Sequence, residues 1–132
     1  MHSEKCIALS KYRIEEAREF LNSGIKNLEM NEYKTANNRA YYSVFHAMRA
    51  VLALDEVDFK KHSGVIAYFR ENYVKTNIFD RQYSDIISST SLIRNKSDYD
   101  DFYIAEKQET EELLDEAKKF VSATEEYLKT RY

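Results

Sequence analysis

An arginine and three carboxylates stand among aromatic residues in segment 92–103, where a helical pattern ends. Arg94 follows Ile87 and Thr90 at the spacings that place side chains on one side of a helix. An arginine on that side requires an anionic partner. Asp98, one turn later, offers an ion pair, although arginine preceding the acid is the weaker order. The alternative is that Arg94 faces a cleft and binds a phosphate, which its fork of donors fits well.

A second group of cationic and aromatic residues falls in segment 32–54 and shortly after it. At about 100° per residue, four of them share one sector of a helix. Arginine neutralises phosphate and tyrosine stacks on bases, so the group suits single-stranded RNA or a nucleotide. A tyrosine-rich helix face is also typical of protein interfaces, and a lone histidine is commonly a buried imidazole without a chemical role. The group consists of Arg39, Tyr42, His46 and Arg49, followed by Lys61 and His62.

The sequence predicts no metal and no cofactor. No two of its three histidines stand three or four residues apart, so a helix-borne pair of zinc ligands is absent. The run Asp98-x-Asp100-Asp101 lacks the length, glycine and terminal glutamate of a calcium loop. Neither a glycine-rich phosphate loop nor a Gly-x-Ser-x-Gly turn occurs, so nucleotide hydrolysis and esterase activity have no support.

Composition indicates one folded globular domain, residues 1–132, with 43% hydrophobic and 33% charged residues. The chain has no proline and only two glycines, whereas hairpin-rich folds need such residues in quantity, so we expect an all-α fold. No signal-peptide pattern and no apolar run of about 18 residues occurs, so we expect a cytoplasmic protein without membrane contact. The single cysteine, Cys6, permits no intrachain disulfide.

Charge is unevenly distributed along a chain whose formal net charge is −3. Basic residues outnumber acidic ones between positions 34 and 75, and the reverse holds between 98 and 132. An anionic ligand is therefore expected to favour the middle of the chain.

Hydrophobic periodicity predicts five helices. Two long helices are expected over about 5–29 and 32–54, and a short one from His62 with Ser63 as its cap. A fourth is expected over 79–96 and a fifth from about 105. The sequence predicts turns at Met30-Asn31 and Asn77 and an interruption over 97–103.

The segment 32–54 is apolar or aromatic most of the way round. Tyr41, Tyr42 and Phe45 lie beyond its core stripe, so a second contact is expected on that side, for which we favour a homodimer. Gly24, in the first helix, marks either a close approach of two helices or a tolerated weak point. The small-residue stripe expected to face the core is Ala36, Ala40, Val44, Ala47, Met48 and Val51.

Three segments resemble the HEPN family, in particular its small stand-alone prokaryotic branch. They are NRAYYSVFHA (38–47), KHSGVIAYF (61–69) and RNKSDY (94–99), and their order extends the match over roughly residues 8–128. The resemblance implies an up-and-down antiparallel bundle of four main helices plus one short helix, commonly a homodimer. It also implies a toxin–antitoxin type gene pair whose other member is a minimal nucleotidyltransferase. Catalytic members of this family cut RNA with an arginine followed four to six residues later by a histidine.

In this sequence the family's arginine matches Arg94, with Asn95 after it as in many ribonuclease members. The positions for the histidine hold Tyr99, Asp100 and Asp101. A tyrosine with an ordinary pKa near 10 transfers protons poorly at neutral pH, so we expect weak or no nuclease activity. His46 or His62 serves as the catalytic partner of Arg94 only if the fold brings one of them near.

Three functions remain open: an RNA- or nucleotide-binding component of a two-gene system, a metal-independent ribonuclease with a displaced histidine, and a non-catalytic dimerisation or docking module. If Arg94 binds phosphate in a cleft, Arg94→Ala should lower affinity and leave the melting temperature nearly unchanged. Related transferases silence their partners by adding nucleotide to a tyrosine near the motif, for which Tyr99 and Tyr103 are the nearest acceptors. The expected ligand-binding residues are Arg39, Tyr42, Arg49, Lys61, Asn95, Asp98 and Tyr99.

Overall fold

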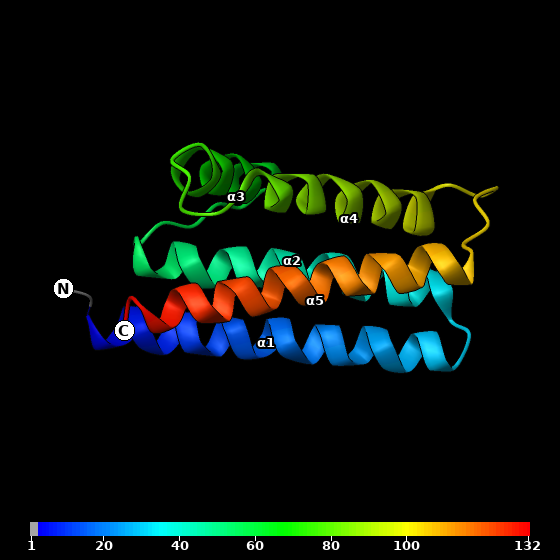
Figure 1. Ribbon diagram of the computed structural model, residues 1–132, viewed down its shortest axis with the longest axis horizontal. Coiled ribbons are helices and arrows are strands. Elements are labelled where there is room, and N and C mark those ends of the chain that lie inside the picture. Colours follow the sequence, from blue (N-terminus) through cyan, green and yellow to red (C-terminus); the bar gives the residue numbers. More distant parts are fainter. Residues whose placement is uncertain (1–2) are drawn as a thin grey trace.

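The computed structural model describes residues 3–132 (Figure 1). Over this part of the chain four long helices run back and forth, and a shorter one lies across them at one end. The short helix continues into a π-helical turn, η1 (Arg70–Val74). The expected all-α bundle of four main helices plus one short helix is therefore confirmed. The helices are α1 (Glu4–Glu29), α2 (Tyr33–Leu54), α3 (His62–Phe69), α4 (Arg81–Tyr99) and α5 (Lys107–Lys129).

Local sequence signals set several helix ends. The Ser3 hydroxyl accepts a hydrogen bond from the Cys6 amide at 3.2 Å and caps α1, and Asp80 caps α4 through the Gln82 amide at 2.9 Å. Asn31 and Asn77 adopt left-handed conformations, with φ of 63° and 64°, in the turns that follow α1 and η1. Asparagine tolerates this region better than most residues, so both expected turns are confirmed.

Two predicted boundaries were wrong. Ser63 does not cap α3, because the helix already begins at His62, with Lys61 at the cap position and no capping side chain. The fourth helix begins at Arg81 and ends at Tyr99, so it is not interrupted at Ser97. Ser97 accepts a bond from buried Asn37, and its side chain is thereby engaged in tertiary contact instead of competing with the helical backbone.

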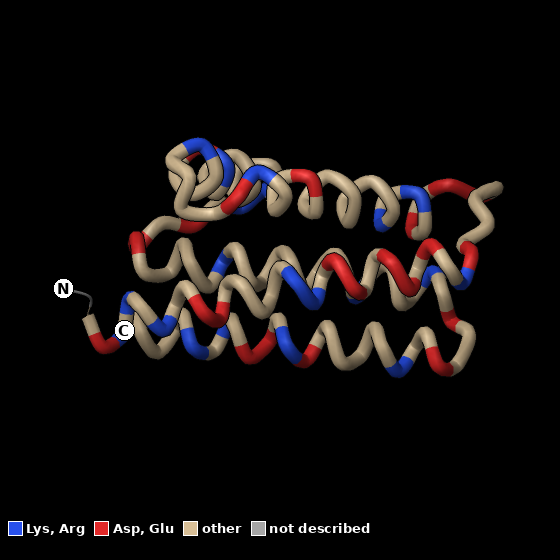
Figure 2. The backbone as a smooth tube through the Cα atoms, viewed as in Figure 1, with Lys and Arg blue, Asp and Glu red and all other residues tan. Residues whose placement is uncertain are grey.

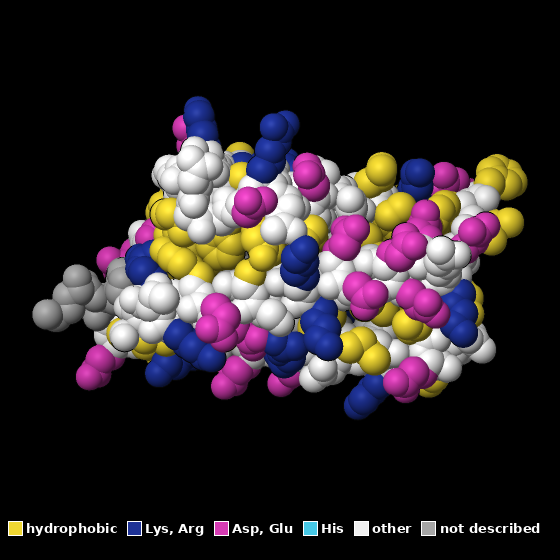
Figure 3. Space-filling model, in the orientation of Figure 1, with side chains coloured by type: hydrophobic (Ala, Val, Ile, Leu, Met, Phe, Trp, Pro, Cys, Tyr) yellow, Lys and Arg dark blue, Asp and Glu magenta, His cyan; other side chains and the backbone are white. Residues whose placement is uncertain are grey.

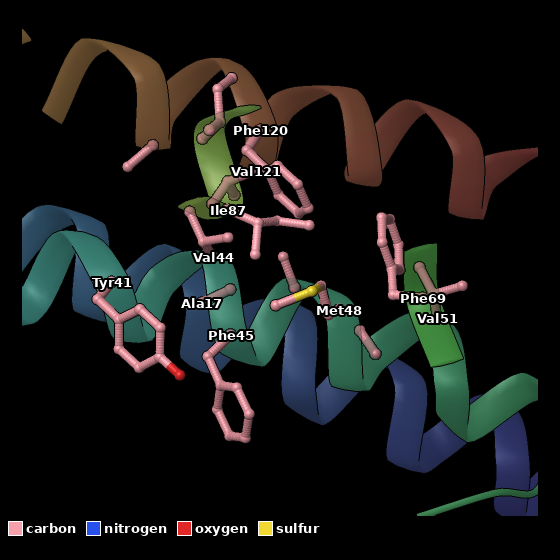
Figure 4. Packing of buried hydrophobic residues seen from close by; sticks show 14 of the residues in the cluster. Ala17, Tyr41, Val44, Phe45, Met48, Val51, Phe69, Ile87, Phe120 and Val121 are labelled. Atoms are coloured by element: carbon pink, nitrogen blue, oxygen red, sulfur yellow. The ribbon is translucent and has the colours of Figure 1, made fainter. Parts of the chain in front are cut away.

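The second helix, α2, lies at the centre of the bundle (Figure 1). All six residues of its expected core stripe are fully buried. Figure 4 shows Val44 and Met48 pointing between the helices toward Phe120 and Val121 of α5, whereas Tyr41 and Phe45 leave α2 on another side. The centre of the molecule is thus an apolar core, with a separate aromatic side on α2.

Gly24 marks a close approach of three helices. A Cβ atom at this position would lie 2.7 Å from Leu114 Cδ2 and 3.4 Å from the Ala36 carbonyl oxygen. The close-approach interpretation of this glycine therefore holds. Within residues 3–132 no helix is both long and apolar enough to cross a bilayer.

Candidate functional site

Arg94, near the end of α4, is held against α2 by a set of polar contacts. Its Nε donates to Asp98 Oδ2 at 2.9 Å, so the ion pair foreseen from the sequence is present. Its Nη2 donates to the hydroxyls of Tyr42 at 3.0 Å and Tyr99 at 3.4 Å. The hydrogen bonds found among residues 3–132 use Nε and Nη2, which leaves Nη1 available to another acceptor.

Three tyrosine rings surround this guanidinium, and we call them the aromatic cage. The Arg94 Cζ lies 5.2 Å from the ring centres of Tyr41 and Tyr42 and 5.4 Å from that of Tyr99. Such cation–π contacts strengthen when water is excluded, and the Arg94 side chain is only 15% exposed. The arginine is therefore fixed in position by contacts to Nε, Nη2 and the faces of its guanidinium group.

His62, the first residue of α3, is coupled to Arg94 through Tyr41. The Tyr41 hydroxyl and His62 Nδ1 are 2.8 Å apart, and the imidazole lies 4.1 Å from the ring centre of Phe45. Burial, followed by the charges of Arg94 and Arg49, lowers the pKa of His62. The ring is therefore neutral at pH 7.

The Tyr41–His62 bond has two possible directions, and they have different chemical consequences. Burial raises the pKa of Tyr41 to about 12, so its hydroxyl keeps its proton. If Tyr41 donates to Nδ1, the hydrogen of the neutral ring sits on Nε2, and His62 can only donate from there. If Nδ1 donates instead, Nε2 is a free acceptor and can take a proton.

Among the described residues, His46 touches this arrangement through ring contacts with Tyr42 and Phe45. Its ring stacks on Phe20 of α1 with centres 5.1 Å apart, and its buried Nδ1 has no hydrogen-bond partner among the described residues. Burial, together with the charges of Arg49, Arg13 and His62, lowers its pKa to about 4. The imidazole is thus a neutral packing element.

A chain of hydrogen bonds extends from Arg94 along α2. Asp98 Oδ2 also accepts from Asn38 Nδ2 at 2.9 Å, and Asn38 Oδ1 accepts from Arg39 Nη1 at 2.6 Å. The Arg39 guanidinium lies 5.7 Å from the ring centre of Phe20. Arg39, Asp98 and Arg94, which were all expected at the site, are therefore neighbours.

Three other expected ligand-binding residues are not part of this cluster. Arg49 pairs with Asp58 at 3.3 Å, together with the buried Arg13. Asn95 is exposed and lines hollows with Leu92 that do not include Arg94. Lys61 is exposed just before α3. Arg49 and Lys61 are thus outside the cluster, whereas Asn95 shares one hollow with Tyr99 but none with Arg94.

The two tyrosines considered for modification differ in accessibility. Tyr99 is 71% exposed at the end of α4, with its hydroxyl beside Arg94. The Tyr103 hydroxyl donates to Glu109, and burial together with this bond raises its pKa. Tyr103 lies in the loop as expected, whereas Tyr99 belongs to the helix.

The aromatic side of α2 is covered within the subunit, contrary to the reasoning that led to a homodimer. Tyr41 and Phe45 are only 2% and 6% exposed, because the ring of His62 packs against both. Tyr42 is half-buried between Arg94 and Phe20. These rings therefore serve the site and leave little surface for a second subunit.

Sequence reasoning did not assign site roles to Tyr41, Asn38 and Phe20. Asn38 lies one helical turn before Tyr42, so their shared face was a signal that could have found it. Phe20 comes from another helix, and no sequence spacing reveals that contact. Among residues 3–132 no group of three or more His, Cys, Asp or Glu side chains is placed to hold a metal ion.

Comparison with known proteins agrees with the fold. The model of the HEPN domain matches residues 10–127. Two proteins of Methanocaldococcus jannaschii are each named "Putative toxin". One is 36% identical over 116 residues, which are 87% of this chain and 78% of the relative. The other is 34% identical over 116 residues, which are 88% of this chain and 86% of the relative. A "UPF0332 protein" of Thermotoga maritima is 29% identical over 112 residues, 85% of each chain. Because the family match covers most of the sequence, this chain belongs to the HEPN domain family.

Proposed function

We propose that this protein is the RNA- or nucleotide-binding component of a toxin–antitoxin type gene pair, acting in the cytoplasm with weak or no nuclease activity. The observation that carries the proposal is the aromatic cage. It fixes Arg94 while leaving Nη1 for a phosphate, and its exposed ring, Tyr99, offers a surface on which a base can stack. The names of the two Methanocaldococcus relatives support the toxin–antitoxin setting.

Weak nuclease activity follows from the proton-transfer groups around Arg94. Metal-independent cleavage needs one group to take the 2′-hydroxyl proton and another to protonate the leaving oxygen. Tyr41 has a pKa raised to about 12, and the carboxylate of Asp98 is bound by both Arg94 and Asn38. Tyr41 is therefore unsuited to proton exchange at neutral pH, and Oδ2 of Asp98 is occupied by its two donors.

A ribonuclease that uses His62 is the second candidate function. A specific observation favours it, because this neutral imidazole is joined to Arg94 through a single tyrosine. The candidate requires the tautomer in which Nδ1 donates to Tyr41 and Nε2 accepts the proton. His46 is the weaker choice, since its ring is packed on Phe20.

The partner in this proposal is a minimal nucleotidyltransferase, which the family resemblance implies. An apolar patch at the end of α4 supports a docking role, with Leu92, Phe102 and Ile104 exposed by 55%, 93% and 81%. Exposed apolar side chains that gather in this way are typical of interaction surfaces. Figure 3 shows apolar atoms projecting at this end of the molecule.

Within the same proposal Tyr99, rather than Tyr103, is the acceptor if the transferase adds a nucleotide. Tyr99 is exposed, and an added phosphate would lie beside Arg94. The Tyr103 hydroxyl is engaged by Glu109, whose negative charge opposes an added phosphate.

The test uses purified protein, labelled single-stranded RNA and EDTA. Retention of intact RNA supports the binding component. Cleavage that disappears in His62→Ala supports the ribonuclease. If the protein neither binds nor cleaves the RNA, the docking module is the remaining function. Arg94→Ala should abolish binding, whereas Arg81→Ala, which removes an exposed arginine from the start of α4, should not. Equal loss in both variants would show only a general charge effect and would remove the assigned role of Arg94.

A further inference from the structure

A polar hollow lies beside the aromatic cage. It has a volume of about 470 Å³ and is formed by the first turns of α2 and the last turn of α4. Its wall carries two cations, two hydroxyls and an amide, together with one carboxylate. The lining residues are Lys34, Thr35, Asn38, Arg39, Ser97 and Asp98.

The one carboxylate of this hollow is already compensated. Asp98 accepts hydrogen bonds from Arg94 and from Asn38, both at 2.9 Å, so its charge is balanced from within the protein. Lys34 and Arg39 are different, because no carboxylate pairs with either of them among residues 3–132. Asn38 and Phe20 hold the Arg39 guanidinium in place without neutralising it. The hollow therefore carries an excess of positive charge.

The side chains that stand between the Arg94 and Arg39 guanidinium groups limit the ligand. Arg94 and Arg39 are connected through Asp98 and Asn38, so two side chains stand between them. In a pyrophosphate the two phosphorus atoms share one oxygen, whereas in RNA a ribose separates successive phosphates. Two intervening side chains are a wider separation than one shared oxygen, so we infer that the phosphate spacing of RNA fits this arrangement better than that of a pyrophosphate.

We propose that this hollow is a second phosphate subsite, which binds the phosphate next to the one held by Arg94. The ligand class is then a single-stranded oligoribonucleotide rather than a mononucleotide. Lys34 and Arg39 supply the charge, and the Thr35 hydroxyl is an additional donor. This inference rests on the proposed role of Arg94 and specifies which of its two ligand classes binds.

The test compares three probes by NMR titration at one ionic strength: uridine monophosphate, uridine diphosphate and the 5′-phosphorylated dinucleotide pUpU. We expect the protein to bind pUpU about fivefold more tightly than the monophosphate, because one additional exposed charge contact contributes a gain of this size. Uridine diphosphate should show no such gain. Lys34→Ala should remove the gain for pUpU and leave monophosphate binding unchanged.

Lys118→Ala is the matched control, because it removes an exposed lysine from α5 and should change neither affinity. Arg39→Ala should also remove the gain for pUpU, but Arg39 packs on Phe20, so the melting temperature of this variant must be compared first. Lys34 is exposed, so we do not expect Lys34→Ala to change the stability of the fold. With longer RNA, the slope of log affinity against log salt should fall by about 0.7 in Lys34→Ala.

Contrary outcomes separate this inference from the proposed function. Equal binding of pUpU and uridine monophosphate would overturn the second subsite and leave the role of Arg94 intact. A gain with uridine diphosphate equal to that with pUpU would also overturn it, because the ligand would then be a nucleoside diphosphate. Failure of all three probes to bind would remove both the subsite and the proposed function.

Discussion

The geometry of Arg94 depends on its planar fork of donors. One edge of the fork bonds Asp98, Tyr42 and Tyr99, and its flat faces lie against tyrosine rings. A lysine places one compact charge at the end of a flexible chain and cannot make these contacts at the same time. The side chain is therefore both a candidate ligand group and a structural contact between α2 and α4.

We accordingly expect Arg94→Lys to retain part of the RNA affinity and Arg94→Ala to lose it. Because the ion pair and cation–π contacts disappear, Arg94→Ala should also lower the free energy of unfolding by about 1 to 2 kcal/mol. This value replaces the sequence-based expectation of an unchanged melting temperature. Chemical denaturation and RNA titration measure the two effects. Full RNA affinity in a folded Arg94→Ala protein would contradict the assignment.

His46 should make the fold sensitive to acid. Its pKa is lowered from 6.5 to about 4, so the unfolded chain binds the proton more readily than the folded one. The stability that depends on its neutral form is complete above pH 6.5 and is lost as the pH falls toward 4. Phe20, Tyr42, Phe45 and Arg49 face this ring, and none of them offers a negative charge to offset protonation.

His46→Phe should therefore stabilise the protein at pH 5 by about 1 to 2 kcal/mol relative to the unmodified chain and change little at pH 7.5. The phenyl ring preserves stacking on Phe20, and the Nδ1 atom that disappears has no partner among the described residues. Thermal unfolding across this pH range provides the measurement. Parallel pH profiles for both proteins would show that His46 is not the source of the acid sensitivity.

At the scale of whole helices, the small residues of α2 allow the bundle to pack closely. Replacing Gly24 by alanine gives better helix propensity, which is worth about 1 kcal/mol, but crowds Leu114 and the carbonyl of Ala36. Overpacking in a core costs about 1 to 3 kcal/mol, so we expect a net loss of about 1 kcal/mol. Denaturant unfolding of Gly24→Ala measures it.

Asn22→Ala is the control for helix propensity, since Asn22 is exposed on the same helix and should gain slightly. Leu114→Val combined with Gly24→Ala should recover part of the loss, because it shortens the side chain that the new methyl group meets. A Gly24→Ala protein more stable than the starting protein would mean that Leu114 moves aside at little cost.

Helical periodicity predicted the main elements because apolar spacing is a local property of the chain. The stripe of α2 from Ala36 to Val51 was correct for this reason. The end of α4 was wrong, because the bond between Ser97 and Asn37 joins residues 60 positions apart. The same holds within the site: spacing placed Arg94 and Tyr42 on suitable helix faces, whereas the Tyr41–His62 bond arises only when α3 packs against α2.

At the scale of the whole molecule, acidic positions gather on the first half of α5 and on the loop before it (Figure 2). The apolar patch of Phe102 and Ile104 lies in that loop, beside Asp100 and Asp101. A partner surface that binds there should therefore be apolar at its centre and basic at its rim.

Co-expression with the nucleotidyltransferase gene tests this surface. We expect the two proteins to copurify, and Phe102→Ser to weaken the complex at least about tenfold, because a large exposed ring is a typical binding hot spot. Phe59→Ser, at another exposed ring, is the control. Intact mass then reports modification, and a shift that persists in Tyr99→Phe would exclude Tyr99 as the acceptor.

The predicted homodimer now depends on a different surface from the one first considered. A hollow of about 310 Å³ lies between α3, η1 and α4, and Ile66 and Leu92 line it. We expect light scattering at micromolar concentration to give the mass of a dimer, and Ser91→Glu, in the same hollow but outside the patch of Leu92, Phe102 and Ile104, to give that of a monomer. A monomer mass for the unmodified protein would end this prediction.

The two sides of the site belong to helices with very different burial. Fourteen residues of α2 are buried, including Tyr41, whereas α4 buries Ile86, Ile87, Thr90 and Ser97. Amide hydrogens of α4 should therefore exchange with solvent through local opening, long before those of α2. A ligand held by both helices would slow exchange mainly in α4. The affinity for such a ligand would then include the free energy of keeping α4 docked on α2. Substitutions far from any ligand contact can therefore change the affinity by changing how often α4 opens.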